Sequence, residues 1–436
     1  MLRSVVWHLV LDVGQSWDLL KISKIFARNI ILIYVRKLLK KEDKIRYKEK
    51  ISSRYFFPTR NKNKKLIWFH AASIGEVQSI FPILEKFILQ EKNIEFLITT
   101  VTLSSGNLVK KYIGDRKNIN HRYFPLDVRF LIKKFLYAWH PNLIIFVDSE
   151  IWPNLIFEIK KNKISSAIIN GRLTEKTFKR WMMVPKFAKQ IFSIFDLCLV
   201  SSKKSKIYFE KLNVQNLKHF GNIKLAGEIN LTNLNNINKD FLIERKFWCA
   251  SSTHKGEEFF CLKTHLNLKK VYKNIITIII PRHIKRSYEI KQLCKKLNLK
   301  SQILENNDLI KNDKEIIIIN SFGVLPKYFK YSKSVFIGKS FLDKFKLIGG
   351  QNPIEAAKLG CKIYHGPHVS NFREIYELFK TYKISEEVSG IEQLTNKLII
   401  DLKSPKIKQN NVSDVINNLG KDILNNSIKE LNKINM

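Results

Sequence analysis

The sequence predicts an α/β protein made of two Rossmann-like, doubly wound domains. Two observations support this prediction. The chain has 436 residues, which is more than one ordinary hydrophobic core accommodates and suits two domains. Short apolar runs also alternate with helical patterns along the chain, as expected for buried parallel strands joined by helices.

The strands are expected in two sets, and polar or glycine-containing loops follow them. The first set covers residues 66–70, 94–101, 143–147, 164–169 and 197–201, and the second covers residues 248–251, 275–280, 316–320, 334–337 and 361–365. Ligands of a doubly wound sheet bind at the carboxyl ends of its strands. We therefore expect the chemistry in the loops that follow these runs.

The gap between the two sets gives the domain limits. We predict a first domain over residues 51–218, a second domain over residues 219–405 and a helical tail over residues 406–436. Charges interrupt the apolar start of the chain, so no run there reaches the ~18–20 apolar residues of a membrane-spanning helix. Residues 1–50 are instead predicted to associate with an anionic membrane, because residues 25–41 have a basic, amphipathic helical pattern. The alternative is an amphipathic helix packed on its own domain.

The composition points to a polyanionic partner. Lys and Arg number 77 against 38 Asp and Glu, which gives a formal net charge of +39. Nucleic acid, an anionic membrane surface and a phosphorylated substrate all fit this charge, and general over-use of Lys accounts for part of it. The five cysteines form no CxxC pair, so neither disulfides nor a metal site is expected.

Several enzyme classes lack their sequence signatures. No GxGxxG follows the first apolar run, and neither GxxxxGK[ST] nor GxSxG occurs in the chain. Dinucleotide oxidoreductases, P-loop kinases and serine hydrolases are therefore disfavoured.

The loop after the first run carries a candidate base. Residues 71–76 bring Ser73, Gly75 and Glu76 into the start of a helix, where backbone amides favour an anion and hold Glu76 ionised. An ionised carboxylate at the edge of the sheet accepts a proton from a sugar hydroxyl. The alternative is an ordinary first-turn glutamate that the helix dipole favours.

Charged residues follow the later strands of the first domain. Asp148 and Glu150 come after one apolar run. Two carboxylates at the end of a strand cost free energy unless they face a cleft, a cation or hydroxyl groups. Arg172 follows the next run and offers a planar fork for phosphate or carboxylate. Lys224 lies near the boundary between the domains. Taken alone, Arg172 and Lys224 are as readily explained as surface cations.

Two loops of the second domain suit phosphate binding. Residues 251–258 open a helix with hydroxyl groups and a cation, and Pro281 and Arg282 end an apolar run.

A third loop is more specific. Gly349 and Gly350 allow close approach of the backbone, and Asn352 and Pro353 suit the start of a helix. Glu355 either completes a capping box with Asn352 or reaches a ribose diol.

In order along the chain, these loops resemble the 3-deoxy-D-manno-octulosonic acid (Kdo) transferases of lipopolysaccharide synthesis. The resemblance runs from about residue 45 to residue 400 through HAASIGEV, DSEIWPN, NGRLTEKTF, GNIK, SSTHKGEE, PRH, GGQNPIEAAKLG and GPHVSNFREI. It implies the GT-B fold, with two Rossmann-like domains facing a cleft. The first domain would bind the acceptor and the second the donor CMP-Kdo, and the sugar centre would be inverted.

The resemblance also implies roles for individual residues. Glu76 would be the proton acceptor, and Asp148 and Lys224 would stabilise the transition state. Acceptor contacts would come from Ser73, Gly75, Glu150 and Arg172. The CMP contacts would come from Pro281, Arg282, Phe322, Gly323, Val324, Asn352, Pro353, Ile354 and Glu355. Neither a metal nor another cofactor is implied.

The chain departs from the family pattern at three places. Asp148 and Val324 stand where the family usually has glutamate, so Asp148 must reach further and only the backbone of Val324 can contact CMP. The stretch between Ser340 and Gly349 is also longer than usual.

The expected activity is transfer of Kdo from CMP-Kdo to lipid IVA, the lipid A precursor, at the cytoplasmic face of a bacterial inner membrane, with anionic lipids as further partners. A GT-B transferase for another nucleotide sugar and a basic nucleic-acid-binding protein are the alternatives. A nucleic-acid-binding protein would need aromatic residues interleaved with the basic ones on a sheet face or in a groove. The loops described above are a poor match to any such module, so we expect no nucleic-acid partner. The sequence leaves open the oligomeric state and the number of Kdo residues added.

Overall fold

The computed structural model describes residues 56, 58, 60, 63–91, 93–229, 234–404 and 410–435. The membrane-associating segment predicted over residues 1–50 lies outside these residues. Within them, every helix is too short or too polar to cross a bilayer.

The first sheet has seven strands in the order β3-β2-β1-β4-β5-β6-β7. They are β1 (Lys65–His70), β2 (Ile94–Thr100), β3 (Ile119–Tyr123), β4 (Leu143–Val147), β5 (Ser165–Gly171), β6 (Leu197–Val200) and β7 (Leu217–His219). The strands β1, β2 and β3 pair in parallel, as do β5, β6 and β7. Asn142, just before β4, bonds to Leu66 near the start of β1, and Asp148, just after β4, bonds to Ile169 near the end of β5. The strand β4 therefore runs in the same direction as its neighbours.

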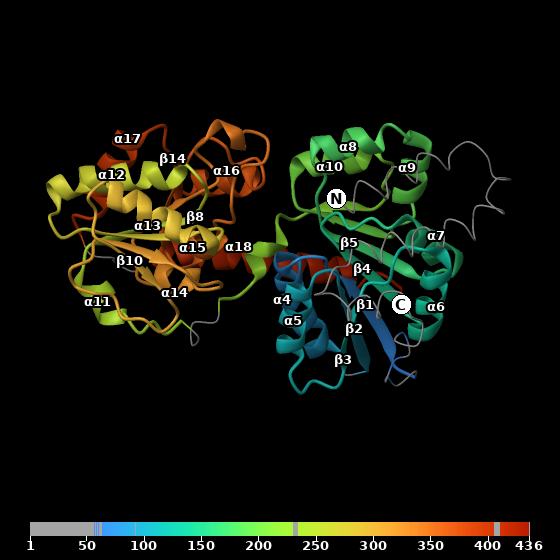
Figure 1. Ribbon diagram of the computed structural model, residues 1–436. Coiled ribbons are helices and arrows are strands. Elements are labelled where there is room, and N and C mark those ends of the chain that lie inside the picture. The colour runs from blue at the N-terminus through green and yellow to red at the C-terminus, as the bar shows by residue number, and fades with distance from the viewer. Residues whose placement is uncertain are drawn as a thin grey trace, which may run out of the picture. The chain divides into compact units, whose positions relative to one another are not determined.

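Helices cover both faces of this sheet. They are α4 (Ile74–Gln90), α5 (Leu103–Ile113), α6 (Arg129–Trp139), α7 (Pro153–Lys161), α8 (Glu175–Trp181), α9 (Pro185–Phe192) and α10 (Lys203–Lys211). Figure 1 shows α4 and α5 on one face and α6 and α7 on the other. The strands β2 and β4 are buried along their whole length, as continuous apolar runs covered on both faces should be.

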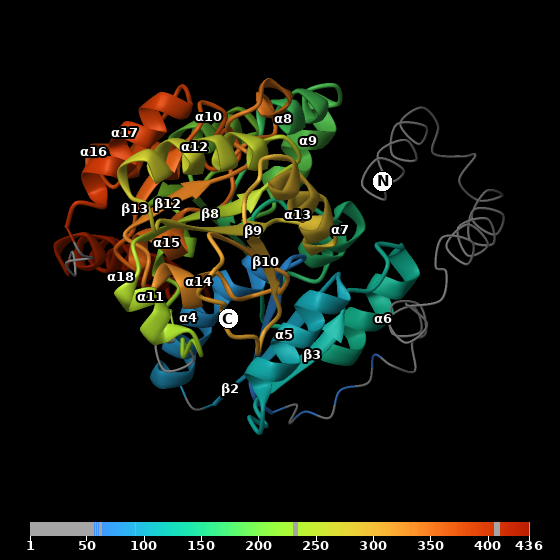
Figure 2. The same ribbon diagram turned by 60° about the vertical axis from the view of Figure 1, so that its left-hand side comes forward.

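The second sheet also has seven strands, in the order β10-β11-β9-β8-β12-β13-β14, and its pairings are parallel. They are β8 (Phe247–Thr253), β9 (Ile276–Pro281), β10 (Ser301–Leu304), β11 (Ile316–Ile319), β12 (Ser334–Ile337), β13 (Lys362–His365) and β14 (Ser385–Glu387). Its helices are α11 (Lys239–Glu244), α12 (Glu257–Val271), α13 (Ser287–Lys296), α14 (Leu325–Phe329), α15 (Ile354–Lys358), α16 (Arg373–Thr381) and α17 (Ile391–Asp401). In Figure 1 and Figure 2, α12 and α14 lie on opposite faces of this sheet.

These two doubly wound parallel sheets confirm the predicted fold class. The limits predicted for the domains, at residues 218 and 405, stay a prediction. Short 3₁₀ turns in the described part of the chain include η3 (Ile223–Ala226), η5 (Ile284–Arg286) and η6 (Asp343–Phe345).

A long C-terminal helix, α18 (Asn410–Leu431), packs against the turn η3. At Gly420 the helix comes so close that a Cβ atom would lie 2.2 Å from the carbonyl oxygen of Leu225. From α15, the Lys358 ammonium donates to the carbonyl oxygen of Gly227, and the Ser413 hydroxyl of α18 donates to the carbonyl oxygen of Lys358. Burial lowers the pKa of Lys358 to about 8, although the carboxylate of Glu228 opposes this shift. The chain after β7 is therefore held by both α15 and α18.

This packing predicts opposite effects for the same substitution at two helical glycines. Alanine in place of a helical glycine ordinarily stabilises by up to ~1 kcal/mol, and we expect Gly75→Ala to leave stability unchanged or raised, since nothing lies within 4 Å of the added Cβ. Gly420→Ala should lower the free energy of unfolding by about 1–3 kcal/mol, because the methyl group meets backbone. Urea unfolding of the two variants checks this, and equal stability of both would contradict the described packing.

Candidate functional site

The loop after β1 carries two of the predicted acceptor contacts and the predicted proton acceptor. Ser73 is exposed, and Gly75 and Glu76 lie in the first turn of α4. Glu76 is buried close to the helix start, and the hydroxyl of Ser79 donates to its backbone carbonyl oxygen over 2.6 Å. The open space beside Gly75 leaves room for a ligand group. A buried carboxylate at a helix start can accept a proton from a hydroxyl that reaches it.

The structure joins Asp148 and Lys224, which are 76 positions apart. Lys224 Nζ lies 3.1 Å from Asp148 Oδ2, and both side chains are largely shielded from solvent. Asp148 directly follows β4 and has a positive φ of 57°, a conformation that aspartate tolerates better than most residues. Lys224 lies in η3, where the Asn222 side chain accepts a hydrogen bond from its backbone N–H. The pair puts a cation and an anion together at the carboxyl end of the first sheet.

Sequence reasoning missed Asn170, which contacts both parts of this pair. Its amide nitrogen donates to Asp148 Oδ1, and its amide oxygen accepts from the N–H of Ile223 over 3.1 Å. The sequence feature that could have indicated Asn170 is its place directly after a buried apolar run, in the same motif as Arg172. Arg172 itself is half-buried, and the structure gives it no hydrogen bond among the described residues.

Glu150 lies beside a buried histidine. Its carboxylate Oε2 is 3.7 Å from His70 Nε2 at the end of β1, and both side chains are buried. The indole of Trp152 donates to the same nitrogen over 3.1 Å, and the other ring nitrogen of His70, Nδ1, lies 2.9 Å from the hydroxyl oxygen of Thr99. Asp148 and Glu150 therefore have different partners, and the sequence analysis gave no role to His70 or Trp152 at this site.

In the second domain, the two residues after the apolar run of β9 differ in exposure. Pro281 is buried at the end of β9, whereas Arg282 is exposed and its backbone N–H donates to the carbonyl oxygen of Thr253. Among the described residues, the Arg282 guanidinium makes no hydrogen bond or ion pair. It is available to an anionic ligand.

The turn between β11 and α14 contains Phe322, Gly323 and Val324. Phe322 is 68% exposed, whereas Val324 is 8% exposed. Gly323 has a φ of 74° and open space beside it. The buried valine side chain fits the expectation that only backbone from this position can meet a ligand.

Of the two roles considered for Glu355, the described structure does not show the capping box with Asn352. Asn352 Oδ1 accepts from the N–H of Ile354 over 3.0 Å, but the Glu355 carboxylate receives no hydrogen bond from the described residues. Burial raises the pKa of Glu355. Pro353 and Ile354 are buried, and Asn352 is exposed. Contact of Glu355 with a ribose diol stays a prediction.

The two glycines before Asn352 are required by packing. A Cβ atom at Gly349 would lie 2.1 Å from the carbonyl oxygen of His368, and Gly350 has a φ of 89° and donates to the carbonyl oxygen of Lys339. Their close approach to backbone is thus explained by the neighbouring loops of the protein itself, rather than by a phosphate.

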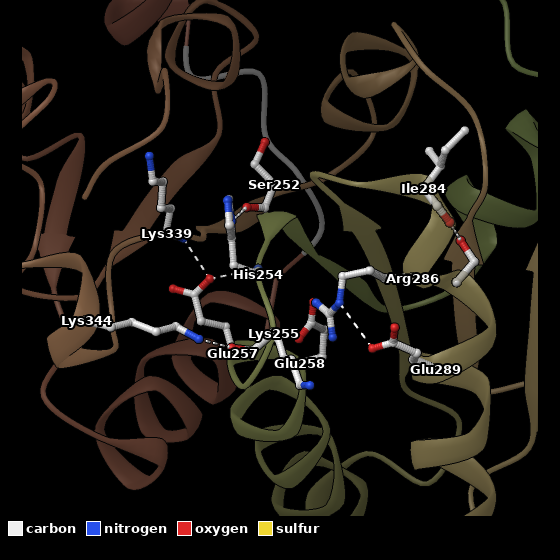
Figure 3. A network of polar contacts seen from close by, with 11 residues as sticks. Ser252, His254, Lys255, Glu257, Glu258, Ile284, Arg286, Glu289, Lys339 and Lys344 are labelled. Atoms are coloured by element: carbon white, nitrogen blue, oxygen red, sulfur yellow. Dashed lines mark hydrogen bonds and ion pairs between the residues drawn. The ribbon is translucent and has the colours of Figure 1, made fainter. Parts of the chain in front are cut away.

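The carboxylate of Glu257, the first residue of α12, links the neighbouring loops (Figure 3). Glu257 is fully buried and accepts from four backbone N–H groups, those of His254, Lys339, Ser340 and Phe341, over 2.7–3.1 Å. Glu258 pairs with Arg286, which also contacts Glu289 at 3.4 Å. The acids of residues 251–258 therefore fix the loops to each other, and phosphate binding by this loop stays a prediction.

His254 lies among cations beside Glu257. Its Nδ1 donates to the carbonyl oxygen of Ser252 over 3.0 Å. Burial, followed by the charges of Lys339, His283 and Arg282, lowers the pKa of His254 to about 4. An anion bound near Arg282 would offset this positive potential.

A cavity of about 340 Å³ borders the turn at Val324. Its wall is polar and includes Asn235, Asn236, Asn238, Glu305, Asn307, Ser321 and Lys327. Val324 is the one predicted CMP residue among its lining residues. Within the described residues, no three His, Cys, Asp or Glu side chains are placed to hold a metal ion.

Comparisons with known proteins support the family resemblance that these loops carry. Residues 49–226 match the family model described as 3-deoxy-D-manno-octulosonic-acid transferase (kdotransferase). The chain is 30% identical over 370 residues to the 3-deoxy-D-manno-octulosonic acid transferase of Rickettsia bellii, covering 84% of this chain and 86% of that protein. It is 32% identical to the enzyme of the same name from Rickettsia typhi, covering 77% and 71% of the two chains.

A solved structure with a similar fold is the UDP-GlcNAc 2-epimerase of Neisseria meningitidis bound to UDP-GlcNAc. It has a TM-score of 0.56 at 12% identity, and the match covers 85% of this chain and all of that one. At this identity the similarity supports the fold alone.

The low pKa of His254 predicts a pH dependence of stability. A histidine that is neutral in the folded state contributes stability above its ordinary pKa of 6.5, and this contribution is lost as the pH falls from 6.5 through about 4. The parent protein should therefore lose more unfolding free energy between pH 7 and pH 5 than His254→Gln does. Urea unfolding at both pH values measures this difference, and identical losses would show that His254 is not held neutral.

Proposed function

The chain belongs to the 3-deoxy-D-manno-octulosonic acid transferase family, and on that premise we propose that it transfers Kdo from CMP-Kdo to lipid IVA. Family membership gives the class of enzyme, a Kdo glycosyltransferase. The nucleotide donor and the lipid acceptor are the proposal. The observation that carries it is the contact between Asp148 and Lys224, since an anion and a cation near the breaking bond can stabilise the charges that develop on the sugar and on the leaving phosphate.

In the proposed reaction, Glu76 removes the proton from an acceptor hydroxyl. The hydroxyl oxygen attacks the anomeric carbon of Kdo from the face opposite the phosphate, and the bond from this carbon to the phosphate oxygen breaks. CMP leaves with the bonding electrons, and the configuration at the anomeric carbon is inverted. Burial of Glu76 at the start of α4 supports its role, because a carboxylate shielded from water has fewer competing proton donors.

Asp148 and Lys224 would act on charges that develop in the transition state. The sugar ring becomes positive as the bond to phosphate lengthens, and the departing phosphate becomes more negative. Lys224 would balance the leaving phosphate, and Asp148 would stabilise the sugar and orient Lys224.

Positive charge supports CMP binding by the second domain. Arg282 is exposed, and it stands with Lys339 and His283 among the groups that lower the pKa of His254. An exposed guanidinium suits the phosphate of CMP-Kdo or the carboxylate of its sugar. The Glu355 carboxylate is the candidate partner of the ribose diol, with Asn352 beside it and backbone contacts from residues 322–324.

We further propose a phosphorylated lipid as the acceptor and an anionic membrane as the surface on which the reaction takes place. The net charge of +39 favours an acceptor with phosphate groups and a surface of anionic lipids. Ser73, Gly75, Glu150 and Arg172 are the proposed acceptor contacts. We place the reaction in lipopolysaccharide biosynthesis, at the cytoplasmic face of the inner membrane.

The proposed base can be tested in one reaction. Purified protein incubated with CMP-Kdo and lipid IVA should give a product heavier by one or more Kdo residues. Glu76→Gln removes the proton acceptor and keeps the size of the side chain, so its kcat should fall by about 10²–10⁴-fold. Glu85→Gln, a half-buried position further along α4, should keep parental activity.

Near-parental turnover by Glu76→Gln would exclude Glu76 as the base. Absence of product with CMP-Kdo, together with product from a UDP-sugar under the same conditions, would instead overturn the proposed donor.

A further inference from the structure

Asn170 occupies an irregular position in the first sheet. The pairing of β5 with β6 shifts register between Ile168 and Gly171, so two residues of β5 face one residue of β6. Such a bulge turns a side chain away from the alternating pattern of the strand. Asn170 also has a positive φ of 54°, which is uncommon outside glycine and is best tolerated by Asn and Asp. The local backbone is therefore arranged around the direction of this one side chain.

Both ends of the Asn170 amide are used. Its nitrogen donates to Asp148 Oδ1, while its oxygen accepts from the N–H of Ile223, the residue before Lys224. The side chain is 3% exposed, so these bonds are made away from bulk water. Asp148 Oδ2 remains available to Lys224 Nζ at 3.1 Å. One amide thus contacts the carboxylate at the end of β4 and the backbone of the turn that carries the ammonium group.

The chemistry of an amide explains why asparagine stands here. The position needs a donor towards Asp148 and an acceptor towards Ile223, and a carboxylate offers acceptors only. Aspartate would place a second negative charge against Asp148. A hydroxyl residue is too short to reach both partners, and Gly has no side chain to bridge them. A general packing role would not require this combination of donor and acceptor.

We propose that Asn170 is a positioning residue that holds Asp148 and Lys224 in the geometry needed for sugar transfer. This inference rests on the proposed function, because it assigns Asp148 and Lys224 to the transition state. Asn170 acts by fixing the orientation of the carboxylate and the backbone of η3, and it does not itself touch the substrates. Outer contacts of this kind affect the rate of the chemical step more than the binding of substrates.

Two substitutions separate the amide from the backbone conformation. Asn170→Gly removes the amide but keeps a residue that adopts positive φ readily. Its kcat should fall by about 10- to 100-fold, the range found when outer contacts of reactive groups are lost. The KM for the nucleotide donor should change much less, since the proposed donor contacts lie in the second domain. Asn213→Gly, at an exposed position with a φ of 65°, is the matched control and should keep parental kcat.

Asn170→Asp adds a pH signature that a purely structural role would not produce. Two carboxylates in hydrogen-bond contact share one proton at low pH, and Lys224 is the charged group that faces the pair on the other oxygen of Asp148. With the shared proton in place, the hydrogen bond and the net charge resemble those of the parent. As the pH rises and the proton leaves, the carboxylates repel each other. The ratio of variant kcat to parental kcat should therefore fall as the pH rises, and a pH-independent ratio near one would overturn the proposal.

A second readout does not depend on catalysis. The rate at which acetic anhydride modifies each lysine can be measured by mass spectrometry of peptides. Loss of the Asn170 amide should loosen the contact with Asp148 and raise the rate at Lys224 severalfold, whereas exposed Lys203 at the start of α10 should react as in the parent.

The outcomes separate the two proposals. If the parent transfers Kdo but the Asn170 variants keep parental kcat and parental reactivity of Lys224, the positioning role is wrong and the proposed function stands. If the parent does not transfer Kdo, the proposed function fails, and unchanged reactivity of Lys224 in the variants would then reject the positioning role independently.

Discussion

The contact between Asp148 and Lys224 is the constraint on which the rest of the first domain's site depends. It ties the end of β4 to a turn that follows β7, and the chain must close a long loop to form it. The surrounding structure limits where Lys224 can go. Asn170 contacts the turn from β5, Gly420 of α18 packs against Leu225, and Lys358 of α15 holds Gly227. A partly shielded ion pair is useful for catalysis only when such contacts fix its geometry in advance.

The second domain uses its charges in a different way. Glu257 accepts from four backbone N–H groups of the loops beside α12, so its carboxylate organises these loops. Arg282 has no carboxylate partner within the described residues and remains exposed. Glu355 is shielded and likewise lacks a hydrogen-bond donor there. The groups left without partners, rather than those in the dense network, are therefore the ones proposed to meet the nucleotide.

The central strands and the loops that follow them could be predicted from the sequence, because apolar residues dominate these strands. Central strands such as β2 and β4 are continuous apolar runs, and their loops could be named in advance, whereas β3, β7, β10 and β14 all lie at sheet edges and lack such runs. Spacing alone could not separate a capping box from an Asx-type contact at Asn352, nor show which backbone Gly349 approaches. The contact of Asn170 with Asp148 depends on a bulge and on pairing between strands, and neither leaves a local pattern in the sequence.

The most direct test of this account is a double-mutant cycle on kcat for Kdo transfer, with Asp148→Asn, Lys224→Met and the double variant. If the two side chains act as one unit, each single substitution removes most of the benefit, and the double variant should be little slower than the slower single variant. Independent contributions that multiply in the double variant would contradict the claim that the ion pair is the functional element.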